Sequence, residues 1–129
     1  DAIFTARGID PAKEDHGTYL HDATAAGRGY GVAGGVADAI VKCINEYYPG
    51  TEVLVEHAEG LADCRKVLLQ AKAGRKNGYL IEGMGCPGGC VAGAGTLLPV
   101  ANAKKEVQKV VHDSTKKLPP KELRRIELN

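Results

Sequence analysis

The segment Gly83–Gly95, which reads GMGCPGGCVAGAG, constrains the fold of this chain more than any other stretch. Glycine adds little to packing and has a high entropic cost when its backbone is ordered, so burial alone is a poor reason for this composition. Two thiols, Cys86 and Cys90, lie within the segment, and Pro87 fixes one φ angle between them. The segment therefore predicts either a site where thiols and backbone meet another group, or an ordinary glycine-rich loop with two incidental thiols.

Helical and strand patterns alternate around this segment. Apolar residues recur at helical spacing in three stretches: 36–48, 61–74 and 99–117. The second stretch is expected to carry one apolar face made of Leu61, Cys64, Val67, Leu68 and Ala71. Two short runs with apolar, β-branched centres, 51–57 and 78–84, are typical of buried strands.

The order helix–strand–helix–strand–helix predicts an α/β fold, in which a small parallel sheet with a right-handed crossover is covered by helices. In such sheets, ligands gather beyond the carboxyl ends of the strands. The segment with the two cysteines follows the strand 78–84 directly, so its place in the fold also favours a site. The length of 129 residues fits one domain, 1–129, with an irregular lead-in at 1–30 and a tail at 118–129.

The bulk composition excludes several classes of function. A formal net charge of +1 gives no electrostatic reason to expect nucleic acid, an acidic partner or a membrane surface. No apolar run approaches the ~20 residues of a membrane span, and the N-terminus lacks the layout of a signal peptide, so we expect a cytoplasmic protein. Residue 1 is Asp and Met84 is the sole methionine, so the chain is either processed or excised from a longer protein, and we expect excision.

Other residues have competing interpretations. GYGVAG at 29–34 has the spacing of a dinucleotide fingerprint, but no convincing strand precedes it. A tightly packed helix entry or a close backbone approach therefore competes there with nucleotide binding. Cys43 and Cys64 fall on apolar helix faces and are expected to pack as small hydrophobic residues. No role is assigned to the four histidines, His16, His21, His57 and His112.

The C-x₃-C spacing of Cys86 and Cys90 differs from the C-x-x-C of redox dithiols and of most zinc knuckles. Gly88 and Gly89 let the backbone turn and bring its N–H groups close to whatever the thiolates hold, which suits a metal–sulfur cluster. A helix beginning near Cys90 would add its positive end. A [4Fe–4S] cubane takes four ligands, so two would have to come from outside the chain, and a structural zinc site is weakened by the same shortage.

With these residues the chain resembles the iron-only ([FeFe]) hydrogenases, whose last cysteine motif reads E-x-M-[AG]-C-P-x-G-C before a glycine cluster. Here the stretch from Glu82 to Cys90 reads EGMGCPGGC. Upstream, GRGYGVAGGVADAI resembles the family's segment G-x-x-F-G-x-T-G-G-V-x-E-A. The stretch VLVEHAEGLADCRKVL fits the family's region V-x-V-A-x-G-x-x-x-A-x-x-L. The resemblance covers roughly residues 22–100.

The resemblance implies a role for each matching residue. Cys86 corresponds to the ligand bound only to the [4Fe–4S] part of the catalytic H-cluster. Cys90 corresponds to the thiolate that bridges this cubane to the di-iron subsite. Met84 corresponds to a methionine beside the di-iron unit, and Tyr30 takes the place of a phenylalanine that lines the same pocket.

Under the same resemblance, Gly88 and Gly89 make room for the cluster and present N–H groups to it. No catalytic residue is identifiable in this chain, because the family's relay cysteine, its cyanide-contacting lysine and two cubane ligands belong to upstream motifs that the sequence lacks. The glycine cluster also reads GAGT in place of the commoner GGGQP, and Gly85 replaces the commoner alanine.

The resemblance thus implies a C-terminal fragment of the H-cluster domain, one lobe of the catalytic domain, which would be inactive alone. Its parent would interconvert protons and electrons with H₂, with an electron carrier such as ferredoxin and the remaining part of the domain as partners. An exposed sheet edge would favour a homodimer of the fragment. The alternative is a non-catalytic, hydrogenase-like iron–sulfur protein that serves cluster assembly or sensing.

Overall fold

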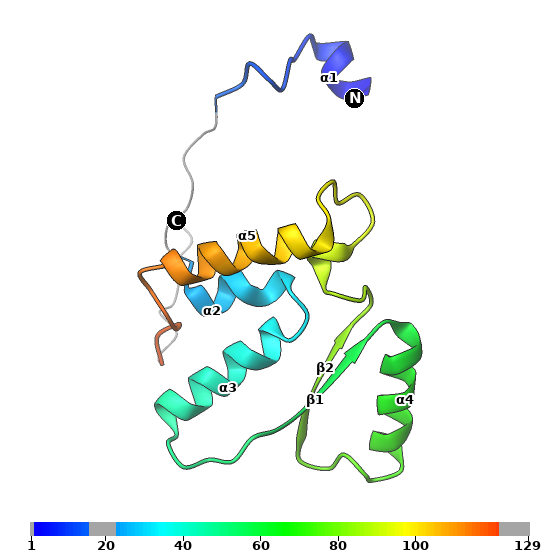
Figure 1. Ribbon diagram of the computed structural model, residues 1–129, viewed down its shortest axis with the longest axis vertical. Coiled ribbons are helices and arrows are strands. Elements are labelled where there is room, and N and C mark those ends of the chain that lie inside the picture. The colour runs from blue at the N-terminus through cyan, green and yellow to red at the C-terminus, as the bar shows by residue number, and fades with distance from the viewer. Residues whose placement is uncertain (1, 16–22, 122–129) are drawn as a thin grey trace, which may run out of the picture.

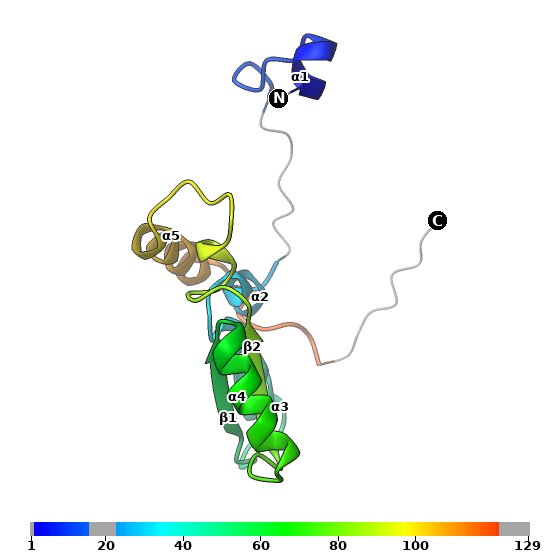
Figure 2. The same ribbon diagram turned by 90° about the vertical axis from the view of Figure 1, so that its right-hand side faces the viewer.

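The computed structural model describes residues 2–15 and 23–121, which form a mixed structure of helices and strands. Its elements in chain order are α1 (Ala2–Arg7), α2 (Ala25–Arg28), the 3₁₀ turn η1 (Gly29–Gly31), α3 (Gly35–Tyr47), β1 (Leu54–Glu59), α4 (Leu61–Lys72), β2 (Tyr79–Met84), the 3₁₀ turn η2 (Cys90–Ala92) and α5 (Val100–Asp113). Figure 1 shows the two strands between α3 and α4, with α2 and α5 packed together beyond one end of the sheet. α1 lies apart from the other elements in Figures 1 and 2.

The strands β1 and β2 form a two-stranded parallel sheet, in which Leu54 lies opposite Tyr79 and Glu59 lies opposite Met84. The predicted α/β class, with a small parallel sheet covered by helices, is confirmed. β1 begins later than the run 51–57 indicates, because the chain is still turning there and the N–H of Thr51 donates to the carbonyl of the preceding turn. The parallel pairing brings the carboxyl ends of both strands to the same edge of the sheet.

α3 begins at two glycines, each required for a steric reason. Gly34 has a φ of +89°, which side chains other than glycine rarely adopt. A Cβ on Gly35 would overlap the carbonyl oxygen of Gly29, because η1 folds back onto the start of the helix. This is the close backbone approach that competed with nucleotide binding at GYGVAG. Within the described residues 23–35 the motif follows α2 rather than a strand and itself begins with η1, so the context of a dinucleotide fingerprint is absent there.

α4 packs on the sheet through only part of its predicted apolar face. Val67 is buried, and Cys64 and Ala71 are half-buried, but Leu61 is 79% exposed and Leu68 is 62% exposed. The two leucines are therefore a correction to the expected packing. A sheet of two strands is narrower than the apolar face of the helix, so it covers the centre of that face and leaves the rest in solvent.

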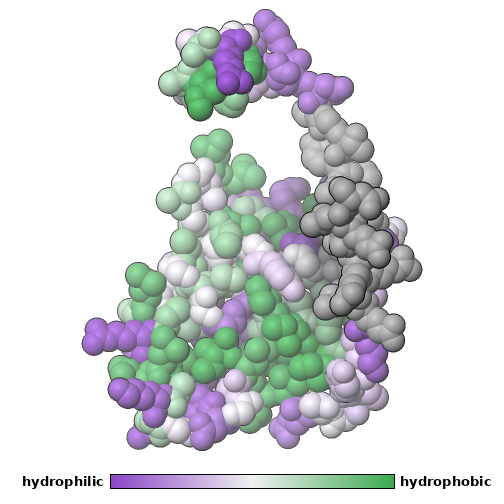
Figure 3. Space-filling view, turned by 180° about the vertical axis from the view of Figure 1, so that it is seen from behind, coloured by the Kyte–Doolittle hydropathy of each residue, from purple (hydrophilic) through white to green (hydrophobic). Residues whose placement is uncertain are grey.

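The buried hydrophobic side chains among the described residues are small: Ala25, Ala26, Ala37, Ala39, Ala58 and Val67. Larger apolar side chains lie at the surface, and Figure 3 shows hydrophobic residues spread over much of one face of the molecule. The core thus forms by close approach of backbones at alanine and glycine positions more than by interlocking large side chains.

α5 ends at Asp113 and the chain then runs along α2. Ser114 is extended, and the carbonyls of Lys116 and Lys117 accept the N–H groups of Ala25 and Ala26 (2.7 and 3.1 Å). These bonds satisfy donors at the start of α2, which explains why the helical pattern up to residue 117 is not completed. Two short helices, α1 and α2, lie in the lead-in expected to be irregular, and most of the tail 118–129 lies outside the described residues.

No helix in the described part of the chain combines the length and the apolar character needed to cross a membrane.

Candidate functional site

The two thiols of the glycine-rich segment lie on a loop directly after β2. Cys86 and Cys90 are both exposed and neither forms a disulfide. Between them, Gly88 and Gly89 are buried and have φ values of +97° and +92°. The loop is closed internally, because the N–H of Gly89 donates to the carbonyl of Cys86 (2.9 Å) and the N–H of Gly93 donates to that of Cys90 (3.0 Å). We call residues 85–93 the cysteine loop. Its two central glycines are buried, and both of its cysteines are exposed.

The cysteine loop docks on the backbone that leads into α3. A Cβ on Gly89 would lie 2.5 Å from the nitrogen of Ala33 and 2.7 Å from the carbonyl oxygen of Gly31. The N–H of Ala33 in turn donates to the carbonyl of Gly88 (3.2 Å). Only glycine allows this approach. The structure therefore brings together the two glycine-rich segments that the sequence places far apart.

A carboxylate from β1 holds the cysteine loop from the other side. Glu59 is the last residue of β1, and its Oε2 accepts the N–H of Gly88 at 2.6 Å. The turn that follows β1 is bonded to the end of β2, just before the loop, since the N–H of Gly60 donates to the carbonyl of Met84 at 2.7 Å. The N–H groups of Gly88 and Gly89, expected to face a cluster, are thus both bonded to protein acceptors. Their contribution to a cofactor stays a prediction. In the structure, these two N–H groups hold the loop in its conformation.

A second carboxylate, Glu82 of β2, binds the N-terminus of α3. This buried side chain accepts the N–H groups of Gly34 (2.5 Å), Val36 (2.9 Å) and Ala37 (3.2 Å), which the helix itself leaves unpaired. His57 of β1 adds a contact of 3.1 Å from its Nδ1. A negative charge at this end of a helix is favourable.

The pKa of Glu82 reflects two opposing causes. Burial of the side chain raises its pKa, but the hydrogen bond from His57 and the backbone bonds from Ala37, Val36 and Gly34 together outweigh burial. The pKa therefore lies below the ordinary value of 4.5. Glu82 is a fixed anion at neutral pH, and it locks the start of α3 onto the sheet.

Met84 and Tyr30 have different surroundings in the structure. Met84 is half-buried at the end of β2, next to the cysteine loop. Tyr30 is 47% exposed and lines an apolar groove of about 540 Å³ between α2 and α3, together with Cys43 and Tyr47. The backbone of Gly31, Val32 and Ala33, rather than Tyr30 itself, meets the cysteine loop.

The other two cysteines do not join the pair on the loop. Cys43 is half-buried in the groove, and Cys64 is half-buried on α4, where its Sγ lies 3.8 Å from the carbonyl oxygens of Ala58 and Met84. Within the residues that the structure describes, no three histidine, cysteine or acidic side chains are grouped as a metal would require. The donor set of the loop is therefore two thiols, which fits part of an iron–sulfur ligand set and not a complete one.

Glu59 and His57 are residues of this site that the sequence pattern did not single out. The available signal was positional: both lie near the carboxyl end of a predicted strand, at the edge where ligands gather in a parallel sheet. That signal could have indicated Glu59, which immediately precedes the glycine that ends the strand. It could not have indicated the bond to Gly88, which depends on how the cysteine loop folds back.

Comparison with protein families identifies a match to this chain. The family model described as the iron only hydrogenase large subunit, C-terminal domain, matches residues 1–94. This stretch includes α3, both strands and the cysteine loop, while α5 lies beyond its end. No curated protein matches the chain.

Proposed function

Because the chain belongs to the family of iron-only hydrogenase large subunits, as their C-terminal domain, we propose that it supplies two thiolates to an iron–sulfur site. At this site the whole enzyme would interconvert protons and electrons with H₂. The observation that carries the proposal is the cysteine loop itself, in which two unpaired, exposed thiols stand on a buried and hydrogen-bonded glycine turn. A loop with incidental thiols has no need of that combination.

Each thiol has a distinct place in this proposal. Cys86 would hold the [4Fe–4S] part of the H-cluster, and Cys90 would bridge that part to the di-iron subsite. Met84, at the end of β2, would lie beside the di-iron unit, and Tyr30 would line the pocket from the lead-in to α3. When bound, the cluster supplies electron storage and a metal centre for hydrogen chemistry.

The residues of the chain itself prepare this site in three ways. The glycine turn carries the two cysteines at exposed positions. The contact of Gly89 with the backbone of Ala33 fixes the loop to the start of α3. Glu82 fixes α3 to the sheet in turn, so the loop rests on a rigid base.

Two thiolates are half of the ligands that a cubane takes, so the remaining ligands would come from another part of the hydrogenase. The chain alone would therefore be inactive. We further propose a cytoplasmic setting, with a carrier such as ferredoxin as the electron partner of the whole enzyme, and homodimers of the isolated chain through its open sheet edges.

Anaerobic reconstitution of the chain with iron, sulfide and excess thiol, followed by EPR of the reduced sample, tests the proposal. We expect an iron–sulfur signal that is lost in a variant carrying both Cys86→Ala and Cys90→Ala. Cys43→Ala, which changes a thiol in the groove away from the loop, is the matched control and should keep the signal. The assignment would be contradicted if the signal survived in the double variant. It would also be contradicted if the signal were lost in Cys43→Ala and kept in the double variant.

A further inference from the structure

We propose that Glu59 is a positioning residue for the two thiols, acting through the backbone of Gly88. Its Oε2 accepts the Gly88 N–H at 2.6 Å, and Gly88 lies between Cys86 and Cys90 in the chain. The inference rests on the proposed function in so far as those thiols are ligands. The bond to Gly88 is a property of the chain without iron.

The two faces of Gly88 show why the cysteine loop depends on a side chain from another element. Gly88 is buried and has a φ of +97°, and it offers no side chain with which to fix itself. Its carbonyl accepts the N–H of Ala33, and its N–H donates to Glu59. Both polar groups of Gly88 are therefore satisfied by distant partners, one on each side of the loop.

The turn after β1 gives Glu59 its place. Glu59 lies opposite Met84 in the register of the sheet, so it ends β1 where the cysteine loop begins. Gly60 then turns with a φ of +85°, and a Cβ there would lie 3.5 Å from the ring of Pro87. The pairing of the two strands thus places the side chain of Glu59 beside Gly88, in the middle of the loop.

The bond from Glu59 is of the strong kind, because a carboxylate accepts a backbone N–H more tightly than a neutral oxygen does. If the carboxylate is removed, the buried N–H of Gly88 loses its partner. Gly88 has no Cβ to restrict its backbone, so its φ and ψ are then free to vary. The angles at Gly88 set how the Cys86 and Cys90 sulfurs are oriented relative to each other. Loss of Glu59 should therefore loosen the geometry of the thiol pair without removing a ligand.

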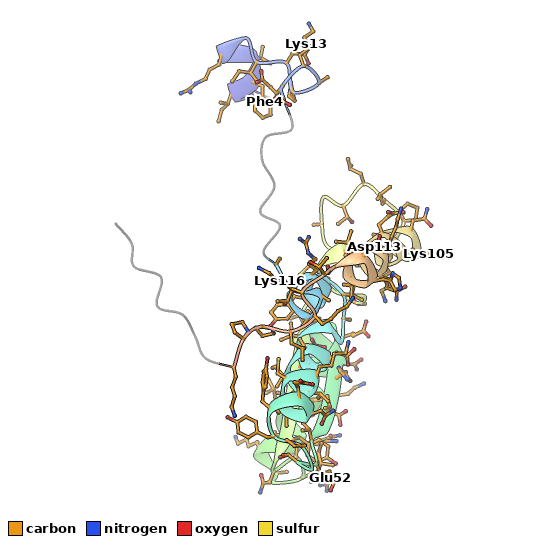
Figure 4. All side chains as sticks on the ribbon, turned by 90° about the vertical axis from the view of Figure 1, so that its left-hand side faces the viewer. Phe4, Lys13, Glu52, Lys105, Asp113 and Lys116 are labelled. Atoms are coloured by element: carbon orange, nitrogen blue, oxygen red, sulfur yellow. The ribbon has the colours of Figure 1, made fainter. Side chains whose placement is uncertain are left out.

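The experiment compares Glu59→Ala and Glu59→Gln with the unchanged chain, all without iron. Amide hydrogen exchange at Gly88, measured by NMR, should become about tenfold faster in Glu59→Ala and much less so in Glu59→Gln, which keeps an oxygen acceptor. Glu52→Ala is the matched control, since Glu52 is exposed, precedes the same strand and lies at the end of the molecule remote from α5 in Figure 4. Exchange at Gly88 that is unchanged in Glu59→Ala would overturn the proposal.

A second measurement connects the loop to the thiols. After reconstitution with iron and sulfide, the iron retained per chain should fall several-fold in Glu59→Ala, recover in Glu59→Gln and stay unchanged in Glu52→Ala. Faster exchange at Gly88 with undiminished iron would overturn the positioning role. If the unchanged chain retains no iron, the proposed function of the chain fails, and the exchange at Gly88 alone decides whether Glu59 holds the loop.

Discussion

Glu82 is the residue on which the start of α3 depends. Its carboxylate replaces the N-cap side chain that α3 lacks, since Gly34 precedes the helix and has none to offer. Three backbone N–H groups share this one acceptor. Glu82 is also the first residue of the motif that carries the family resemblance. The structure gives a reason for a glutamate at this position: it binds the start of α3, and this role does not involve iron.

Replacing Glu82 with alanine should destabilise the chain by about 2–4 kcal/mol, because the buried donors of Gly34, Val36 and Ala37 lose their acceptor. Urea unfolding followed by circular dichroism measures the change. Glu46→Ala, at an exposed position near the end of the same helix, should change the free energy of unfolding by less than about 0.5 kcal/mol. Equal effects of the two substitutions would show that the cap contributes nothing.

The lowered pKa of Glu82 has a consequence for acid stability. A carboxyl group whose pKa is lower in the folded than in the unfolded chain stabilises the fold above its unfolded value, here 4.5. That stabilisation is lost as the pH falls from this value through the folded pKa. The free energy of unfolding, measured at a series of pH values from about 7 to about 3, should therefore decrease less in Glu82→Gln than in the unchanged chain. Equal decreases would mean that the carboxylate is not the group that titrates.

At the scale of elements, the contact between the cysteine loop and the lead-in to α3 is made by backbone alone. Gly89→Ala should destabilise the chain by about 2–3 kcal/mol, because the new Cβ meets the nitrogen of Ala33 and the φ of +92° is unfavourable for alanine. Gly85→Ala is the matched control on the same loop, since a Cβ there has open space around it. Thermal unfolding of both variants, and their iron content after reconstitution, measures the difference. If Gly85→Ala lowered the stability as much as Gly89→Ala, the backbone contact would not be the cause of the destabilisation.

α4 offers a contrast within one helix. Val67 and Leu68 share the apolar face that the sequence pattern defines, but only Val67 is buried against the sheet. Val67→Ala should therefore lower the free energy of unfolding by about 1–2 kcal/mol, while Leu68→Ala should lower it by less than about 0.5 kcal/mol. Urea denaturation of the two variants checks this order. A larger effect at Leu68 would place the helix differently on the strands.

The spacing of apolar residues was sufficient to predict α3, α4 and α5, because periodicity is a property of each short segment alone. The order of helices and strands was sufficient to predict the parallel pair. The spacing could not predict which part of the face of α4 is covered, since that depends on the number of strands beside it. The thiol pair could be identified from composition, and its family from the motif around it. The bonds of Glu59 and Glu82 could not, because a carboxylate reveals its partner only once the strands have brought it to another segment.

At the scale of the whole molecule, the small size of the buried side chains limits stability. The described core consists of alanines and one valine, and large apolar side chains such as Leu61 and Leu97 are exposed. Such a core excludes little apolar surface from water, so we expect the free energy of unfolding of the isolated chain to lie at or below the lower end of the usual range of ~5–15 kcal/mol. Chemical denaturation at neutral pH measures this value. A result well inside the range would mean that the exposed leucines are covered in solution.

The bond between Glu82 and Gly34 joins residues that are 48 positions apart in the chain. Closing so long a loop is slow and entropically costly, and the contacts that it permits form only afterwards. The cysteine loop rests on the segment that this closure delivers, so we expect its two sulfurs to acquire their final orientation late in folding. Iron delivered to the chain before that moment would meet two independent thiols, and iron delivered afterwards would meet a prepared pair. We therefore expect the folded chain to take up iron more readily than the unfolded chain, because only the folded chain holds the two thiols in one arrangement.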